Sequence, residues 1–178
     1  MKQNRVLVVG GALMASWLVY KIYQDMRAQE SSLSEDVVNN QKLPRGIRNN
    51  NPLNIEFNSN NSWIGQVGSD GRFSKFSESK YGIRAAAKLI SNYMSRYKLD
   101  TIHKIINRWC PSEEKGNNTT SYVETVSRRT GIGENVKIKR SDIPKIINAM
   151  IFVENGQNPY QSQHIVDSCA LVDIYGDI

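Results

Sequence analysis

The chain of 178 residues has only two cysteines and two histidines. His103 and His164 lie too far apart in the sequence to form a recognisable metal-ligand motif, so we predict neither a metal nor a cofactor. Cys110 and Cys169 would close a long loop if they paired in an oxidising compartment. Otherwise they would remain two buried thiols, which is the state that we favour.

Long runs of basic residues are also missing, although the net charge is +6 and the isoelectric point is near 9.3. The positive charges are scattered singly, without an interleaved series of aromatic side chains, which argues against a dedicated nucleic-acid-binding function. A basic protein still favours an anionic partner, and nucleic acid, anionic lipid and bacterial wall polymers all qualify. Apolar residues make up 39% of the chain, which is typical of a folded protein.

One uncharged apolar run, from Val6 to Tyr20, follows two basic residues at the start of the chain. It is longer than most signal-peptide cores and shorter than an ordinary spanning helix of roughly 20 residues, and aromatic side chains at its end can extend its reach. We therefore interpret residues 1–23 as an uncleaved signal anchor, with residues 6–23 in a lipid membrane and the remainder exported. The alternative is a buried N-terminal helix of a soluble protein.

A polar linker, residues 24–43, separates this anchor from a domain that we expect to span residues 44–178. Ser69-Asp70-Gly71 between short apolar runs predicts a β-hairpin over residues 63–76. Four amphipathic helices are predicted by apolar side chains at helical spacing, so the fold class is mainly α, or α+β. They are Glu78 to Tyr97; Ile102 to Trp109, capped by Asp100 or Thr101; one around Tyr122, capped by Asn118 or Thr119 and ended by Gly131; and one capped by Ser141 or Asp142 and ended by Asn155-Gly156.

The segment from Arg45 to Ile55 reads RGIRNNNPLNI and is expected to organise the domain. Gly46 allows backbone angles that other residues avoid, the asparagines favour left-handed or side-chain-capped turns, and Asn51 before Pro52 is pushed away from helix. We therefore predict a rigid, polar, non-helical segment that contributes little to the core. It is either an ordinary surface turn or one wall of a site that binds a partner rich in hydroxyl and amide groups.

Glu154 lies on the apolar stripe of the last predicted helix, three, four and seven residues after Ile151, Met150 and Ile147. A carboxyl group in an apolar surround has a raised pKa and can stay protonated near neutral pH, as a general acid requires. Alternatively, fraying of the helix turns Glu154 outward, or an arginine pairs with it.

A linked series of motifs covers most of residues 44–160. Its members are Arg45–Ile55, Trp63-Ile64-Gly65-Gln66, Asp70-Gly71-Arg72-Phe73, Phe76, Tyr81-Gly82-Ile83-Arg84-Ala85, Arg108-Trp109-Cys110-Pro111 and Tyr122. The series resembles a family of phage and prophage virion structural proteins that look like lysozyme-fold peptidoglycan hydrolases. The resemblance implies a lysozyme-like helical domain with a small β-hairpin wing.

A second resemblance is local. The stretch from Ile147 to Pro159 is similar to the helix of lytic transglycosylases that ends in the catalytic glutamate, where serine and glycine normally follow. Here Asn155 replaces the serine, and the helix lies at the C-terminal end of the domain. The resemblance implies that Glu154 acts as acid and then as base.

These observations predict a membrane-anchored enzyme, associated with the phage virion, that cleaves the glycan strand of peptidoglycan as a lytic transglycosylase or muramidase. Glu154 is the expected catalytic residue, with Glu56 as a possible second carboxylate. The expected partners are peptidoglycan, the lipid membrane and other virion proteins, at the virion or at the host inner membrane with the domain facing the periplasm. The residues expected to bind sugar by stacking and hydrogen bonding are Asn50, Asn51, Trp63, Asp70 and Tyr81.

Two other functions fit the same sequence. The chain could be a catalytically inactive structural virion membrane protein that binds the cell wall. It could also be a basic nucleic-acid-binding module on a membrane, in which case it would retain DNA in a salt-sensitive manner.

Overall fold

The computed structural model describes residues 42–114, 116 and 118–175, together with the isolated positions Lys21, Gln24 and Arg27. Its contacts divide the chain into Met1–Leu43 and Pro44–Ile178, and the second unit is described here by itself. Apart from Lys21, the predicted anchor at residues 6–23 lies outside the described residues. Within the described part, no helix combines the length and apolar character needed to cross a membrane.

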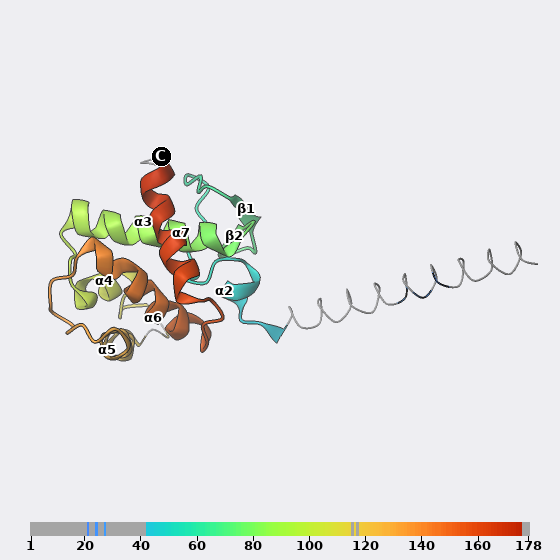
Figure 1. The fold of residues 1–178 in the computed structure, drawn as a ribbon. Coiled ribbons are helices and arrows are strands. Elements are labelled where there is room, and N and C mark those ends of the chain that lie inside the picture. The colour runs from blue at the N-terminus through green and yellow to red at the C-terminus, as the bar shows by residue number, and fades with distance from the viewer. Residues whose placement is uncertain are drawn as a thin grey trace, which may run out of the picture. The chain divides into compact units, whose positions relative to one another are not determined.

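The unit from Pro44 is mainly helical with one small antiparallel sheet, as the sequence predicted (Figure 1). Its elements are α2 (Arg45–Arg48), β1 (Gln66–Ser69), β2 (Ser74–Phe76), α3 (Ser79–Tyr97), α4 (Ile102–Trp109), α5 (Thr119–Thr130), η1 (Arg140–Asp142), α6 (Ile143–Asn155) and α7 (Ser162–Tyr175).

The predicted hairpin forms where expected. Strand β1 pairs antiparallel with β2, and Gln66 faces Phe76 while Ser69 faces Ser74. The Asp70 carboxylate accepts hydrogen bonds from the backbone N–H groups of Arg72 and Phe73, at 3.1 and 2.9 Å, and so closes the turn. A short aspartate side chain that bonds to the backbone two residues on is the usual reason for its presence in turns.

The helix ends also follow local sequence chemistry. Thr101 caps α4 and Asn118 caps α5, because each side chain accepts a hydrogen bond from the backbone N–H three residues later. Gly131 ends α5 and Gly156 ends α6 in the left-handed conformation, with φ of 70° and 68°. This conformation is the common helix stop that glycine provides without steric cost.

The prediction for Arg45–Ile55 was wrong in two respects. Arg45–Arg48 form a one-turn helix, α2, after Pro44. The segment also belongs to the core, since Asn51 and Leu53 are fully buried. A polar segment can be buried because the Asn51 amide donates to the carbonyls of Ile55 and Ser74, both at 2.9 Å, and accepts from the Ile55 N–H at 3.0 Å.

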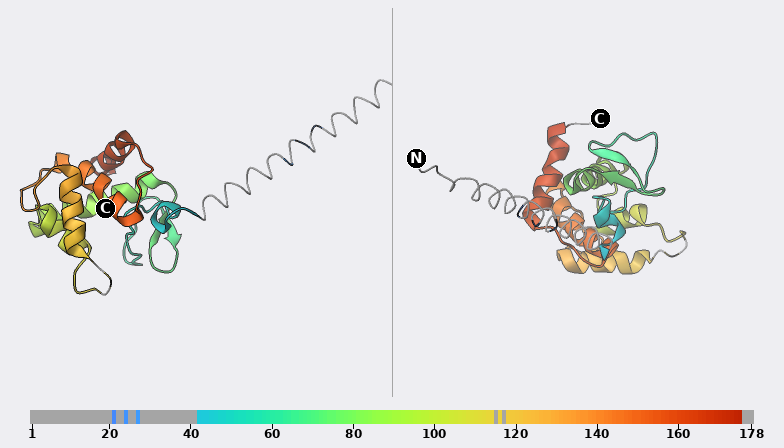
Figure 2. Two further views of the ribbon diagram at one scale, coloured as in Figure 1. Left: turned by 90° about the horizontal axis from the view of Figure 1, so that it is seen from below. Right: turned by 90° about the vertical axis from the view of Figure 1, so that its right-hand side faces the viewer.

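Helix α7 was not predicted, although it completes the core. Its residues Ile165 and Val172 are buried with the apolar side chains of α3 and α6, and it lies across α3 (Figures 1 and 2). Its apolar stripe is interrupted by Ser168, which is buried because its hydroxyl donates to the His164 carbonyl at 2.6 Å. Sequence periodicity alone does not count such a serine as a core residue.

Candidate active site

Glu154 is held at the end of α6 by three side chains from distant parts of the chain. Asn54 Nδ2 lies 3.0 Å from Glu154 Oε2, and Tyr122 OH and Trp109 Nε1 lie 2.9 and 3.2 Å from Oε1. All three groups are donors, so each points a hydrogen at the carboxyl group. The resulting cluster of Asn54, Trp109, Tyr122 and Glu154 is called the Glu154 cluster below.

The electrostatics of the cluster keep the carboxyl group easy to protonate. Burial raises the pKa of Glu154, whereas the hydrogen bonds from Asn54, Tyr122 and Trp109 lower it, and burial is the larger effect. Burial and the nearby Glu154 charge raise the pKa of Tyr122 well above its ordinary value, so that phenol remains a hydrogen-bond donor. Glu154 is half-buried, so solvent still reaches part of the residue.

The end of α6 contacts Arg45–Ile55, which is called the asparagine segment below. Asn155 Nδ2 donates to the Pro52 carbonyl at 2.7 Å and to the Ile151 carbonyl at 2.8 Å. A Cβ at Gly46 would lie 2.8 Å from the side-chain oxygens of Asn54 and Asn155 and 2.9 Å from the Asn51 carbonyl oxygen, so a larger residue would have to displace them. Asn54, whose backbone is left-handed with φ of 50°, brings the segment Arg45–Ile55 into contact with Glu154.

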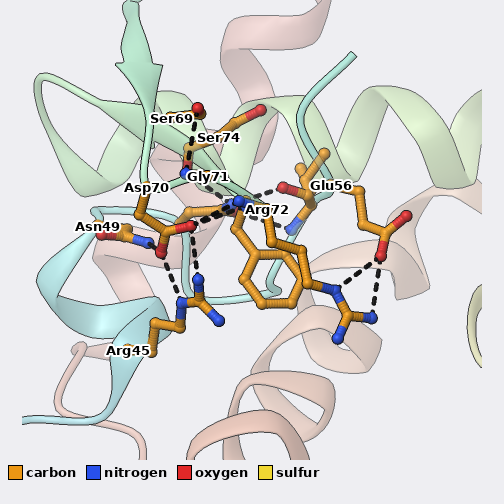
Figure 3. A network of polar contacts seen from close by, with 11 residues as sticks. Arg45, Asn49, Glu56, Ser69, Asp70, Gly71, Arg72 and Ser74 are labelled. Carbon is orange, nitrogen blue, oxygen red and sulfur yellow. Dashed lines mark hydrogen bonds and ion pairs between the residues drawn. The ribbon is translucent and has the colours of Figure 1, made fainter.

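The other predicted carboxylates lie in a separate polar network on the hairpin (Figure 3). Arg45 Nε and Nη2 donate to Asp70 at 2.6 and 2.8 Å, and Asn49 adds a third side-chain donor. The Arg45 hydrogen bond holds the pKa of Asp70 well below its usual range. Glu56 pairs with Arg72 at 3.0 Å on the exposed surface. Within the described residues, neither carboxylate bonds to a member of the Glu154 cluster.

The remaining predicted sugar-binding residues are used in packing. Asn50 Nδ2 donates to the carbonyls of Phe76 and Ser77, at 3.1 and 3.2 Å, and Asn51 is enclosed in the core. Trp63 and Tyr81 are half-buried and pack against the hydrophobic core. In contrast to Asn54, none of these residues has a hydrogen bond to Glu154.

Sequence reasoning missed the donors of the cluster. Trp109 and Tyr122 belong to the motif series that suggested a family, but nothing in the sequence assigned them a role. Asn54 is the last asparagine of the segment Arg45–Ile55, and its place in this expected site wall was the signal that could have identified it. Cys110 and Cys169 are free thiols, as favoured, although both are half-buried rather than buried. In the described part, no group of three or more histidine, cysteine, aspartate or glutamate side chains could hold a metal.

Comparison with known proteins places the chain among phage proteins. No protein-family model matches it. It is 42% identical over 125 residues to Protein P5 of Pseudoalteromonas phage PM2, and the match covers 68% of this chain and 77% of the phage protein. The chain therefore belongs to the family of Protein P5 of this phage.

Proposed function

We propose that the chain cleaves the glycan strand of peptidoglycan and that Glu154 is its catalytic acid. The observation that supports this most is a half-buried carboxyl group with a raised pKa, oriented by three donors. Glycoside cleavage needs a positioned proton donor whose pKa lies near the working pH. We also propose that the unit from Pro44 has the lysozyme-like fold that the motif series suggested.

The proposed reaction uses one carboxyl group twice. Protonated Glu154 gives its proton to the glycosidic oxygen as the bond from that oxygen to the anomeric carbon breaks. The carboxylate then takes a proton from the attacking hydroxyl, which is either a hydroxyl of the same sugar or a water molecule. Asn54, Trp109 and Tyr122 stabilise the anionic form between these steps. Because Glu56 and Asp70 are engaged on the hairpin, the single-carboxylate route is favoured over a two-carboxylate route.

The biological setting is inferred from the family and the charge. A phage protein with a net charge of +6 is suited to the anionic bacterial wall. We place it in the virion, associated with a membrane through residues 6–23, or in the host inner membrane with its folded unit toward the periplasm. Other virion proteins are expected partners there.

The test is a comparison of Glu154→Gln with Glu56→Gln in the full chain. We expect Glu154→Gln to reduce muropeptide release from purified peptidoglycan by roughly 10²–10⁴-fold, because the proton donor is lost. Glu56→Gln, which removes only an exposed ion pair, should retain activity. Mass analysis of the products identifies the attacking group. Attack by a sugar hydroxyl gives anhydro sugars, whereas attack by water gives reducing sugars.

The substitution of Glu154 by glutamine is expected to preserve the fold. Glutamine keeps one oxygen for Trp109 and Tyr122, and its amide nitrogen would face Asn54. The Asn54 side-chain oxygen has no hydrogen-bond partner, so rotation of that amide would supply an acceptor. Loss of activity therefore reports chemistry rather than unfolding, and a circular dichroism spectrum checks this.

The alternative is a wall-binding virion protein without catalysis. The same three hydrogen bonds would serve a purely structural carboxylate, which is the observation in its favour. Sedimentation of the chain with peptidoglycan, without release of muropeptides by the unsubstituted protein, would support this function. Release that survives Glu154→Gln would instead contradict the assignment of the acid.

A further inference from the structure

Two adjoining cavities lie on the face formed by α3, α6 and α7, away from the Glu154 cluster. The larger, the α6–α7 groove, has a volume of about 1030 Å³. The smaller, the Lys88 pocket, has a volume of about 560 Å³. They share Ser91, Arg140, Val172 and Asp173, so they lie next to each other. Ligand sites in proteins commonly have volumes of about 300–1,000 Å³.

Apolar residues make up about half of the lining of the α6–α7 groove. They include Val166, Cys169 and Ala170 from α7, and Ile143, Pro144 and Ala149 from α6. Val166 is 44% exposed although it is apolar, so this part of α7 faces solvent in the groove. The lining of α7 runs from Ser162 to Asp173, which is roughly 16 Å along a helix axis. A single acyl chain fits an elongated apolar groove of this kind.

The Lys88 pocket is cationic. Lys88, Arg96 and Arg140 line it, with Asp173 as the one acidic residue of its lining. Lys88 is 6% exposed, and burial, together with repulsion from Arg84, Arg96 and Arg140, lowers its pKa. Arg140 also bonds to Asp173 at 3.2 Å on the exposed rim. Arg129 and Lys145 also line the α6–α7 groove, so cationic side chains border both cavities.

We propose that these cavities bind one anionic phospholipid, with an acyl chain in the α6–α7 groove and the phosphate in the Lys88 pocket. Charge complementarity selects an acidic headgroup, and the apolar walls select a hydrocarbon chain. The site would let the folded unit contact lipid independently of residues 6–23. It does not depend on the proposed hydrolase activity.

Binding is tested with the full chain in a nonionic detergent, by native mass spectrometry. The probes are lysophosphatidylglycerol, which is anionic, and lysophosphatidylcholine with the same acyl chain, which is zwitterionic. We expect one bound lysophosphatidylglycerol per chain and at least ten-fold weaker binding of the choline lipid. Equal binding of the two lipids would overturn the proposal.

Three variants locate the site. Arg96→Gln/Arg140→Gln should weaken lysophosphatidylglycerol binding by about 30-fold, because each surface cation contributes roughly five-fold. Ala170→Trp should also weaken it, since Ala170 is exposed and the indole would fill the groove. The control Lys75→Gln/Lys98→Gln removes the same charge outside both cavities and should bind normally. Loss of binding in the control that equals the loss in Arg96→Gln/Arg140→Gln would contradict the site.

Two further competitors separate lipid from other anions. Inorganic phosphate that displaces the lipid at micromolar concentration would indicate an anion site only and overturn the lipid assignment. The chain could also bind an oligonucleotide, lose that binding in Arg96→Gln/Arg140→Gln, and fail to bind lysophosphatidylglycerol. This result would assign the cations to a nucleic-acid site instead. Failure of both to compete with bound lipid supports the proposal.

Discussion

At the scale of single residues, the same type of side chain has opposite roles in the two polar clusters. Asp70 is surrounded by donors that include the Arg45 guanidinium, and its pKa is held well below the usual range. Glu154 has only neutral donors, and burial raises its pKa. A full positive charge therefore distinguishes a carboxylate that remains ionised from one that is easily protonated.

Asp70→Asn is expected to destabilise the fold at neutral pH. It replaces a charged acceptor of several hydrogen bonds, which should lower the free energy of unfolding by about 2–3 kcal/mol at pH 7. A depressed pKa in the folded state stabilises above the unfolded pKa of about 4, and this contribution is lost as the pH falls below it. Urea unfolding should therefore show a smaller difference between Asp70→Asn and the unsubstituted chain at pH 3 than at pH 7.

The control for this prediction is Glu56→Gln, since Glu56 lies before the hairpin and pairs with Arg72 in its turn. The Glu56–Arg72 pair is exposed, with 66% and 62% of the side chains accessible, so its loss should change stability by less than about 1 kcal/mol. Equal losses for the two variants at pH 7 would mean that the Asp70 network has no special contribution.

At the scale of elements, the asparagine segment is fixed between α3 and α6. Its contact with α6 passes through Asn155 and Asn54, and its contact with α3 passes through Gly82. A Cβ at Gly82 would lie only 2.1 Å from the Asn50 carbonyl oxygen, which is backbone. Helix α3 therefore approaches the segment as closely as a glycine permits.

Gly82→Ala tests whether the close approach of α3 to the asparagine segment stabilises the fold. In an isolated helix alanine is more favourable than glycine by about 1 kcal/mol, so helix propensity alone predicts stabilisation. We expect the reverse, a loss of about 3 kcal/mol in unfolding free energy, because the methyl group would displace backbone. Thermal unfolding followed by circular dichroism measures the sign directly.

Ser91→Ala is the control on the same helix. It leaves the contact with Asn50 intact and should change the unfolding free energy by no more than about 0.5 kcal/mol. A stabilised Gly82→Ala chain would mean that α3 can move away from the segment at little cost.

At the scale of the whole molecule, the last helix belongs to the same core as the first helices. Ile165 is 1% exposed in the core, whereas its neighbour Val166 is 44% exposed in the groove. We expect Ile165→Ala to cost about 2–5 kcal/mol and Val166→Ala much less, because only the first leaves a buried cavity.

The unfolding transition shows whether α7 unfolds together with the rest of the core. In chemical unfolding of Ile165→Ala, far-ultraviolet circular dichroism and tryptophan fluorescence should shift together, because a single core unfolds cooperatively. Loss of only part of the helical signal, while Trp109 remains in its folded environment, would show that α7 detaches by itself.

The sequence by itself determined the local features. The hairpin turn at Asp70, the stops at Gly131 and Gly156, and the position of Glu154 on an apolar stripe all depend on residues close together in the chain. The sequence also narrowed each cap of α4 and α5 to two neighbouring residues, of which the structure uses Thr101 and Asn118. Such features follow from backbone preferences and short-range hydrogen bonds, which a sequence contains directly.

Only the tertiary structure decided which groups meet. It joined Asn54 to Glu154 across a separation of 100 residues and brought Trp109 and Tyr122 to the same carboxyl group. It also buried Asn51, because partners distant in the sequence satisfy its amide, and it placed α7 on the core despite a serine in the apolar stripe. A polar side chain can be buried only where the folded chain supplies its hydrogen-bond partners, and local sequence does not specify them.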